Sequence, residues 1–121
     1  LERQLVSPDV LMLVCEVEGK LAGNCQLDLN RWRKTRHRGQ VAIALLKDYW
    51  GLGIGTAMFE EMIDKARQEK LEQLELEVIE GNQRAIELYH KMGFVYTGEK
   101  PNAIRLEDGS SLKELMMVKV L

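Results

Sequence analysis

Runs of apolar residues along the chain predict strands near its beginning. Residues 11–17 and 20–28 flank Glu18-Gly19, and a glycine at that point tolerates the positive φ of a tight hairpin turn. Residues 40–46 form a nearly continuous apolar run, which is typical of a buried central strand. We therefore expect an antiparallel hairpin followed by a central strand.

Two later stretches have the period of a helix. From 54 to 66, apolar residues recur every four positions with polar residues between them. From 85 to 92, apolar residues stand at i, i+3, i+4 and i+7, after Asn82 as an N-cap and before Gly93 as a C-cap. Between these two helices, residues 74–78 alternate with period two, as a strand with one apolar face does.

The last strands are expected at 94–105 and 112–121, joined by a turn at Asp108-Gly109. The resulting order is three strands, a helix, a strand, a helix and two strands. A strand-helix-strand unit implies a parallel pair with a right-handed crossover, and the hairpins imply antiparallel edges. The prediction is a mixed α/β fold, with a mostly antiparallel sheet around a central parallel unit, in a single domain over residues 1–121.

Composition narrows the class of protein. The chain has 121 residues, of which 45% are hydrophobic and 30% charged, as in an ordinary soluble domain. No apolar run is long enough to span a membrane and no export leader is visible, so we expect a cytoplasmic protein with no membrane partner. The two cysteines are interpreted as small, half-buried packing residues, and the two histidines lack the spacing of metal ligands, so no metal is expected.

The charge is unevenly distributed around a net value of −2. Residues 31–38 carry five basic side chains and no acidic one, whereas residues 60–80 carry eight acids and three bases. The basic stretch contains Trp32 and could bind nucleic acid through phosphate contacts and base stacking. A solvated loop, or a loop facing a small anionic ligand, is favoured because a nucleic-acid-binding domain is usually basic over a whole face.

Three glycines at alternate positions, Gly51, Gly53 and Gly55, stand between the central strand and the first helix. Such a turn exposes backbone N–H groups at the positive end of a helix dipole, which suits a phosphate or pyrophosphate. The alternative is a tight turn whose glycines only permit close packing. The lysine of a P-loop is absent, and the spacing differs from that of a dinucleotide site.

These residues resemble the GNAT superfamily of N-acetyltransferases. The family signature Gln/Arg-x-x-Gly-x-Gly/Ala aligns with residues 50–55, where Gly53 and Gly55 match and Trp50 replaces the first residue. A second pattern, L-E-V, N, A, LY and GF, is matched in order between 76 and 94. The resemblance covers about residues 10–121 and is closest to bacterial members of the family.

The resemblance implies the GNAT acyl-CoA acyltransferase fold, shortened at its N-terminus because the family usually begins with a strand and one or two helices. It implies acetyl-CoA as cosubstrate, with the pantetheine arm along the central strand and beside Asn82, and the pyrophosphate on the glycine turn. The cofactor-binding residues expected on this basis are Ile43, Leu45, Gly51, Leu52, Gly53, Ile54, Gly55, Thr56 and Asn82.

The acceptor implied by the resemblance is a primary amine: a small amine, an amino acid or a protein N-terminus. Such an amine is protonated at neutral pH and must lose a proton before it attacks the thioester. Glu77 matches a position where some members carry a general base, and Tyr89 matches a general acid for the departing thiolate. The backbone amide near Leu45 would polarise the thioester carbonyl. Alternatively, Glu77 is a solvated glutamate and Tyr89 a core residue.

Two other functions remain open at this point. The chain could be a non-catalytic acyl-CoA-binding module of the same fold, or a nucleic-acid-binding domain that uses residues 31–38. An exposed edge on the strand at 11–17 would also favour a homodimer, because unpaired strand edges associate readily.

Overall fold

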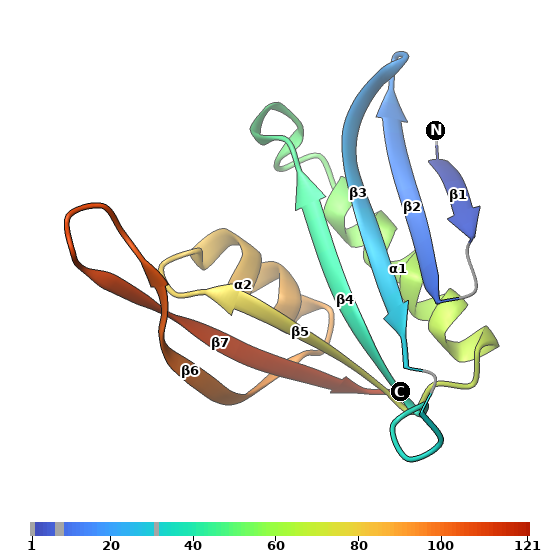
Figure 1. Ribbon diagram of the computed structural model, residues 1–121. Helices are drawn as coiled ribbons and strands as arrows, with labels where there is room; N and C mark the ends of the chain where they lie inside the picture. The colour runs from blue at the N-terminus through green and yellow to red at the C-terminus, as the bar shows by residue number, and fades with distance from the viewer. Residues whose placement is uncertain (1, 7–8, 31) are drawn as a thin grey trace.

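The computed structural model describes residues 2–6, 9–30 and 32–121. The described residues form one seven-stranded sheet in the order β1-β2-β3-β4-β5-β7-β6, with two α-helices (Figure 1). The elements are β1 (Glu2–Val6), β2 (Val10–Val17), β3 (Lys20–Leu29), β4 (Arg38–Leu45), the 3-10 helix η1 (Lys47–Tyr49), α1 (Ile54–Gln68), β5 (Gln73–Ile79), α2 (Gln83–Lys91), β6 (Val95–Arg105) and β7 (Ser111–Val120).

The centre of the sheet has the predicted topology. β4 and β5 run parallel and are connected by α1, while β4 is antiparallel to β3 and β5 is antiparallel to β7. The first hairpin turns at Glu18 and Gly19, both with positive φ (51° and 78°), as its sequence predicts. These features confirm the mixed α/β fold with a central parallel unit.

The first strand, β1, was not predicted. It pairs antiparallel with β2 over its whole length, so the edge of β2 that we expected to be exposed is hydrogen-bonded. The prediction of an exposed edge on β2 is therefore wrong, and that edge offers no site for pairing with a second copy. The sequence signal is weak because a five-residue strand offers only two or three residues to each face, too few to establish a period of two.

Both helices pack against the same face of the sheet, behind it in the view of Figure 1. Leu74, Leu76 and Val78 of β5 point to that face and are buried, while Glu75 and Glu77 point to the other. The core between sheet and helices is continuous, and Phe59 of α1 is fully buried in it.

Cys15 and Cys25 are free thiols in this core, buried rather than half-buried. Burial raises the pKa of Cys25 to about 12, because the charged thiolate is poorly solvated there. A thiol with so high a pKa is a poor nucleophile at neutral pH, so Cys25 acts as a packing residue.

An ion pair joins β4 to β5 where the two strands are still hydrogen-bonded. The guanidinium of Arg38 donates from Nε and from Nη2 to the two carboxylate oxygens of Glu75, the second at 2.9 Å. The amide of Gln73 also donates to this carboxylate, at 2.7 Å. The hydrogen bond from Arg38 holds the pKa of Glu75 below its usual range, since it is made to the charged form.

This lowered pKa makes the stability of the domain depend on pH. A carboxylate with a depressed pKa in the folded state stabilises the fold above its unfolded pKa of about 4.3, and that stabilisation is lost as the pH falls through the folded value. We expect Arg38→Gln to lower the free energy of unfolding at pH 7 by up to about 1 kcal/mol, since the pair is partly exposed. Urea unfolding should show a smaller effect at pH 3. Equal losses of stability for Arg38→Gln at pH 7 and pH 3 would contradict the assignment of the pH dependence to the Arg38–Glu75 pair. Lys113→Gln removes the ion pair with Glu99 on the β6–β7 hairpin and serves as a comparison for an ion pair elsewhere on the sheet.

Candidate functional site

The site begins where the central parallel pair separates. β4 and β5 are hydrogen-bonded only from Arg38 to Gln40 on β4 and from Gln73 to Glu75 on β5. Beyond that point the two strands diverge (Figure 1), although β4 remains paired with β3 as far as Leu45. The other edge of β4 therefore presents backbone N–H and C=O groups that have no strand partner among the described residues.

A pocket of about 520 Å³ lies at this divergence, between the end of β4, the glycine turn, the first turn of α1 and one face of α2. Most of the residues predicted to bind the cofactor line it: Ile43, Leu45, Gly51, Gly53, Ile54, Gly55, Thr56 and Asn82. Leu52 does not line it, and its side chain is exposed. The structure thus brings together residues from three elements that are far apart in the sequence.

The glycines of the turn have different physical roles. Gly51 and Gly53 have φ of 78° and 79°, in the left-handed region that favours glycine, and the space beside the Cα of Gly53 is open. Gly55 is buried in α1, where a Cβ would lie 2.9 Å from Cδ2 of Leu88. Gly53 therefore keeps the turn open on the side that lines the pocket, whereas Gly55 permits α1 and α2 to pack closely.

The N-terminus of α1 faces the pocket without a side-chain cap. Gly53 is the N-cap, and no acidic residue lies in the first turn. The carbonyl of Gly53 accepts the first intrahelical bond, from the N–H of Ala57, so the N–H groups of residues 54–56 precede the helical ladder. Of the described pocket-lining residues, two are cationic, Arg84 and Lys91, and none is acidic. This arrangement suits an anionic ligand.

The second helix brings Asn82 and Tyr89 to the pocket. Asn82 is the N-cap that the sequence predicts, because its side chain accepts a hydrogen bond from the N–H of Ala85 at 3.4 Å. Tyr89 is 7% exposed, and its ring makes edge contacts with Phe59 and Phe94, at centroid distances of 5.6 and 6.3 Å. Tyr89 is therefore a core residue that also lines the pocket, so its packing role does not exclude a role at the site.

Burial changes the acidity of Tyr89. It raises the pKa of the phenol above its ordinary value, and the nearby Cys25 thiol adds a smaller effect in the same direction. The phenol consequently stays protonated over the whole range of pH in which enzymes usually work. A protonated phenol beside a pocket can donate a hydrogen bond to an atom that gains negative charge there.

Glu77 lies apart from these residues. It is exposed on the opposite face of β5 and does not line the pocket. Hydrogen bonding to Glu114 on β7 raises its pKa, because that bond requires the protonated form, and partial burial and the charge of Glu114 act in the same direction; Lys100 opposes them. The sequence pattern does not reveal Glu114, since only the strand register, in which it pairs with Ile79, brings it diagonally next to Glu77.

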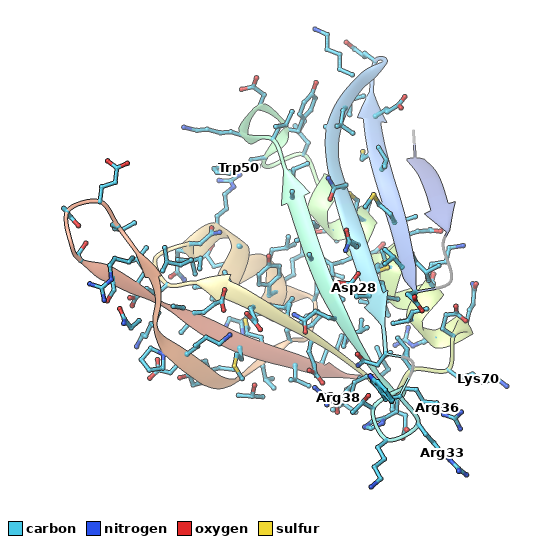
Figure 2. The ribbon with its side chains drawn as sticks, in the orientation of Figure 1. Asp28, Arg33, Arg36, Arg38, Trp50 and Lys70 are labelled. Atoms are coloured by element: carbon cyan, nitrogen blue, oxygen red, sulfur yellow. The ribbon has the colours of Figure 1, made fainter. Side chains whose placement is uncertain are left out.

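The basic stretch is far from the pocket. Its described residues are 32–38: residues 32–37 form the loop before β4, and Arg38 is the first residue of that strand, whereas the glycine turn follows the other end of the strand. Figure 2 shows Arg33 and Arg36 at one end of the molecule and Trp50 at the other. This loop is solvated, with Trp32 80% exposed, and none of its described residues lines the pocket. Arg31 lies outside the described residues.

Among the described residues, no three His, Cys, Asp or Glu side chains are grouped as metal ligands would be. None of the described helices is long and apolar enough to cross a membrane.

Solved structures share this fold. An acetyltransferase of the GNAT family from Streptococcus pneumoniae superposes with a TM-score of 0.88 and is 32% identical, over 95% of this chain and 69% of that one. YncA, a putative acetyltransferase from Salmonella typhimurium solved with its cofactor acetyl-CoA, superposes with a TM-score of 0.81 and 23% identity, over 93% of this chain and 65% of that one. The fold is that of the GNAT acetyltransferases.

Sequence comparison assigns the family. The model of the Acetyltransferase (GNAT) family matches residues 1–94, and the chain belongs to that family. It is also 38% identical over 85 residues to an uncharacterized N-acetyltransferase of Methanocaldococcus jannaschii. That match includes 67% of this chain and only 37% of the archaeal protein.

Proposed function

We propose that the chain transfers the acetyl group of acetyl-CoA to a primary amine. The observation that carries this proposal is the convergence of three groups on one pocket: the unpaired edge of β4, the uncapped first turn of α1 and the phenol of Tyr89. Membership of the GNAT acetyltransferase family supports it, as does the acetyl-CoA bound to the Salmonella protein of the same fold.

The residues of the pocket fit acetyl-CoA part by part. The amides of a pantetheine arm can pair with the free edge of β4 near Ile43 and Leu45, as another strand would. The side chain of Asn82 stands beside this arm. The backbone N–H groups of residues 51–56, including that of Leu52, are available for the pyrophosphate, and Lys91 and Arg84 supply positive charge. No metal is required in this scheme.

In this proposal, the two faces of the sheet contribute to different parts of the reaction. Tyr89 lies on the helix side of β5, and Glu77 lies on the opposite side. We propose that the thioester lies at the divergence of β4 and β5, with the amine approaching from the face that carries Glu77. Glu77 accepts a proton from the ammonium group through a water molecule, because it stands outside the pocket.

The transfer itself forms one bond and breaks one. The neutral amine nitrogen attacks the thioester carbonyl carbon, and the backbone amide near Leu45 stabilises the resulting oxyanion. The C–S bond then breaks and the thiolate leaves, while the nitrogen that now carries the acetyl group releases its second proton to solvent water. The phenol of Tyr89 hydrogen-bonds to that thiolate as its charge develops.

A thiol-release assay against a panel of primary amines, amino acids and peptide N-termini tests the proposal. We expect release of CoA well above the uncatalysed rate with at least one acceptor class. Glu77→Gln should lower kcat/KM by about 100-fold at pH 7, the effect of losing a general base. The loss should shrink at higher pH, where more of the acceptor amine is already neutral. Glu107→Gln, in the exposed β6–β7 turn, is the control and should match the wild type.

Two outcomes distinguish the alternatives. A non-catalytic acyl-CoA-binding module would bind acetyl-CoA in calorimetry yet release thiol at the uncatalysed rate with every amine. Absence of binding to both acetyl-CoA and CoA would contradict the enzyme and the module together. The raised pKa of Glu77 gives a further check, because Glu114→Gln should move the acidic limb of the pH profile to lower pH.

A further inference from the structure

Two of the side chains that line the pocket, Arg84 and Trp50, contact each other, and the proposed function gives Trp50 no role. The guanidinium carbon of Arg84 lies 4.8 Å from the centroid of the Trp50 ring, which is a cation–π contact. The indole Nε1 of Trp50 in turn donates a hydrogen bond to the carbonyl oxygen of Leu45 at 3.0 Å. The end of β4, the glycine turn and the start of α2 are thus joined through two side chains.

The contact brings the guanidinium against the glycine turn. A Cβ on Gly51 would lie 3.3 Å from Nη2 of Arg84, so the absence of a side chain there leaves room for the approach. Arg84 forms no ion pair with the described residues, and both Arg84 and Trp50 line the pocket. Stacking on an indole occupies only the flat face of a guanidinium and leaves its N–H groups free in the plane.

We propose that Arg84, held in place by Trp50, binds a phosphate group of the acyl carrier and makes the site select acetyl-CoA over a thioester that lacks the nucleotide. The inference rests on the proposed function and extends it to specificity. Arg84 touches the ligand, and Trp50 is a positioning residue that acts through Arg84. This proposal also accounts for Trp50, the one departure from the family signature, because the indole positions Arg84.

The observations favour phosphate over other anionic groups. The residues of the first turn of α1, whose N–H groups precede the helical ladder, line the same pocket, and Lys91 lies two turns beyond Arg84 on the same side of α2. Lys91 donates a hydrogen bond to the hydroxyl of Thr56 at 3.4 Å, which places its charge beside that turn. Several donors around one turn of backbone suit a group with many acceptor oxygens.

Calorimetry with two thioesters tests the proposal. S-acetylpantetheine has the reactive arm of acetyl-CoA and none of its phosphates. We expect Arg84→Gln to weaken acetyl-CoA binding about 10- to 30-fold, as loss of a charge-assisted contact does, and to leave S-acetylpantetheine within twofold of the wild type. Arg84→Lys should lie between, because lysine keeps the charge and loses the planar fork. Arg36→Gln removes the same charge at the far end of the molecule (Figure 2) and should change neither affinity.

A third ligand and a second position sharpen the test. Acetyl-dephospho-CoA lacks only the 3′-phosphate. If Arg84→Gln also weakens binding of this ligand, Arg84 contacts the pyrophosphate. If Arg84→Gln binds this ligand as the wild type does, Arg84 contacts the 3′-phosphate. Trp50→Leu removes the stacking surface and should weaken acetyl-CoA binding about fivefold, whereas Trp50→Phe keeps the ring and should weaken it less. The double variant Trp50→Leu/Arg84→Gln should bind acetyl-CoA with the same affinity as Arg84→Gln alone, because the indole acts through the guanidinium.

The outcomes separate this inference from the proposed function. If the wild type binds acetyl-CoA and Arg84→Gln weakens both thioesters equally, or neither, Arg84 is not a phosphate ligand and the proposed function stands. Additive losses from the two positions would overturn the role of Trp50. If the wild type binds no acetyl-CoA, both proposals fail together. Arg84 is exposed, and circular dichroism of each variant verifies that the fold is retained.

Discussion

Gly53→Asp is expected to lower the affinity for acetyl-CoA by more than 100-fold while the domain stays folded. Gly53 is the N-cap of α1, with φ of 79° and open space where a Cβ would stand. Aspartate is among the residues that adopt this left-handed conformation most readily, and a carboxylate at a helix N-terminus interacts favourably with the dipole. The new carboxylate would therefore stand where the phosphate is proposed to bind, and it would repel that phosphate. Calorimetry measures the affinity and a thermal melt the stability.

Two variants separate charge from backbone strain. Gly53→Asn introduces a side chain of the same shape without the charge, and we expect it to lose no more than about 10-fold in affinity. Gly109→Asp places the same residue at another glycine with positive φ and open space, in the β6–β7 turn away from the pocket. It should bind acetyl-CoA as the wild type does. Equal losses for the aspartate and asparagine variants at position 53 would show that shape, and not charge, governs the turn.

Tyr89→Phe is expected to lower kcat by about 10- to 100-fold and to leave the affinity for acetyl-CoA nearly unchanged. An ordinary thiol has a pKa of about 8.5, below that of tyrosine, and burial raises the pKa of Tyr89 further. Complete transfer of the proton to the thiolate is therefore uphill. The role proposed for the phenol is instead that of a hydrogen-bond donor to developing charge, which a phenylalanine ring cannot replace.

Single-turnover thiol release with saturating acetyl-CoA measures this effect apart from binding. Tyr96→Phe is the matched control, since Tyr96 is an exposed residue of β6 that does not line the pocket. The ring of Tyr89 packs on Phe59 and Phe94, and phenylalanine preserves these contacts, so the melting temperature should stay close to that of the wild type. Normal turnover of Tyr89→Phe would restrict Tyr89 to its packing role.

Much of the pocket is predictable because its determinants are local. The glycines of the turn, the N-cap at Asn82 and the helical stripe that carries Tyr89 each follow from residues within a few positions of one another. The parallel order of β4 and β5 follows from the helix that connects them. Local backbone preferences and the rules for connecting strands therefore predict most of the residues that line the pocket.

The remaining features depend on contacts between distant segments. Glu114 lies beside Glu77 only because of the register between β5 and β7, which no periodicity in either strand specifies. Arg84 of α2 contacts Trp50, which precedes the glycine turn, and a lone arginine at the start of a helix gives no sign of such a partner. β1 pairs with β2 along its whole length, and the five residues of β1 alone carry no sign of that partner.

The short pairing between β4 and β5 makes stability and binding compete. Three residue pairs join the two strands, and the backbone groups beyond them are the ones proposed to receive the pantetheine arm. A sequence change that extended the parallel pairing of β4 and β5 would add hydrogen bonds to the sheet. The same change would close the pocket between the two strands. The same reasoning implies that selection for thermal stability alone, applied to residues 41–45, would tend to yield a firmer protein that no longer accepts its cosubstrate.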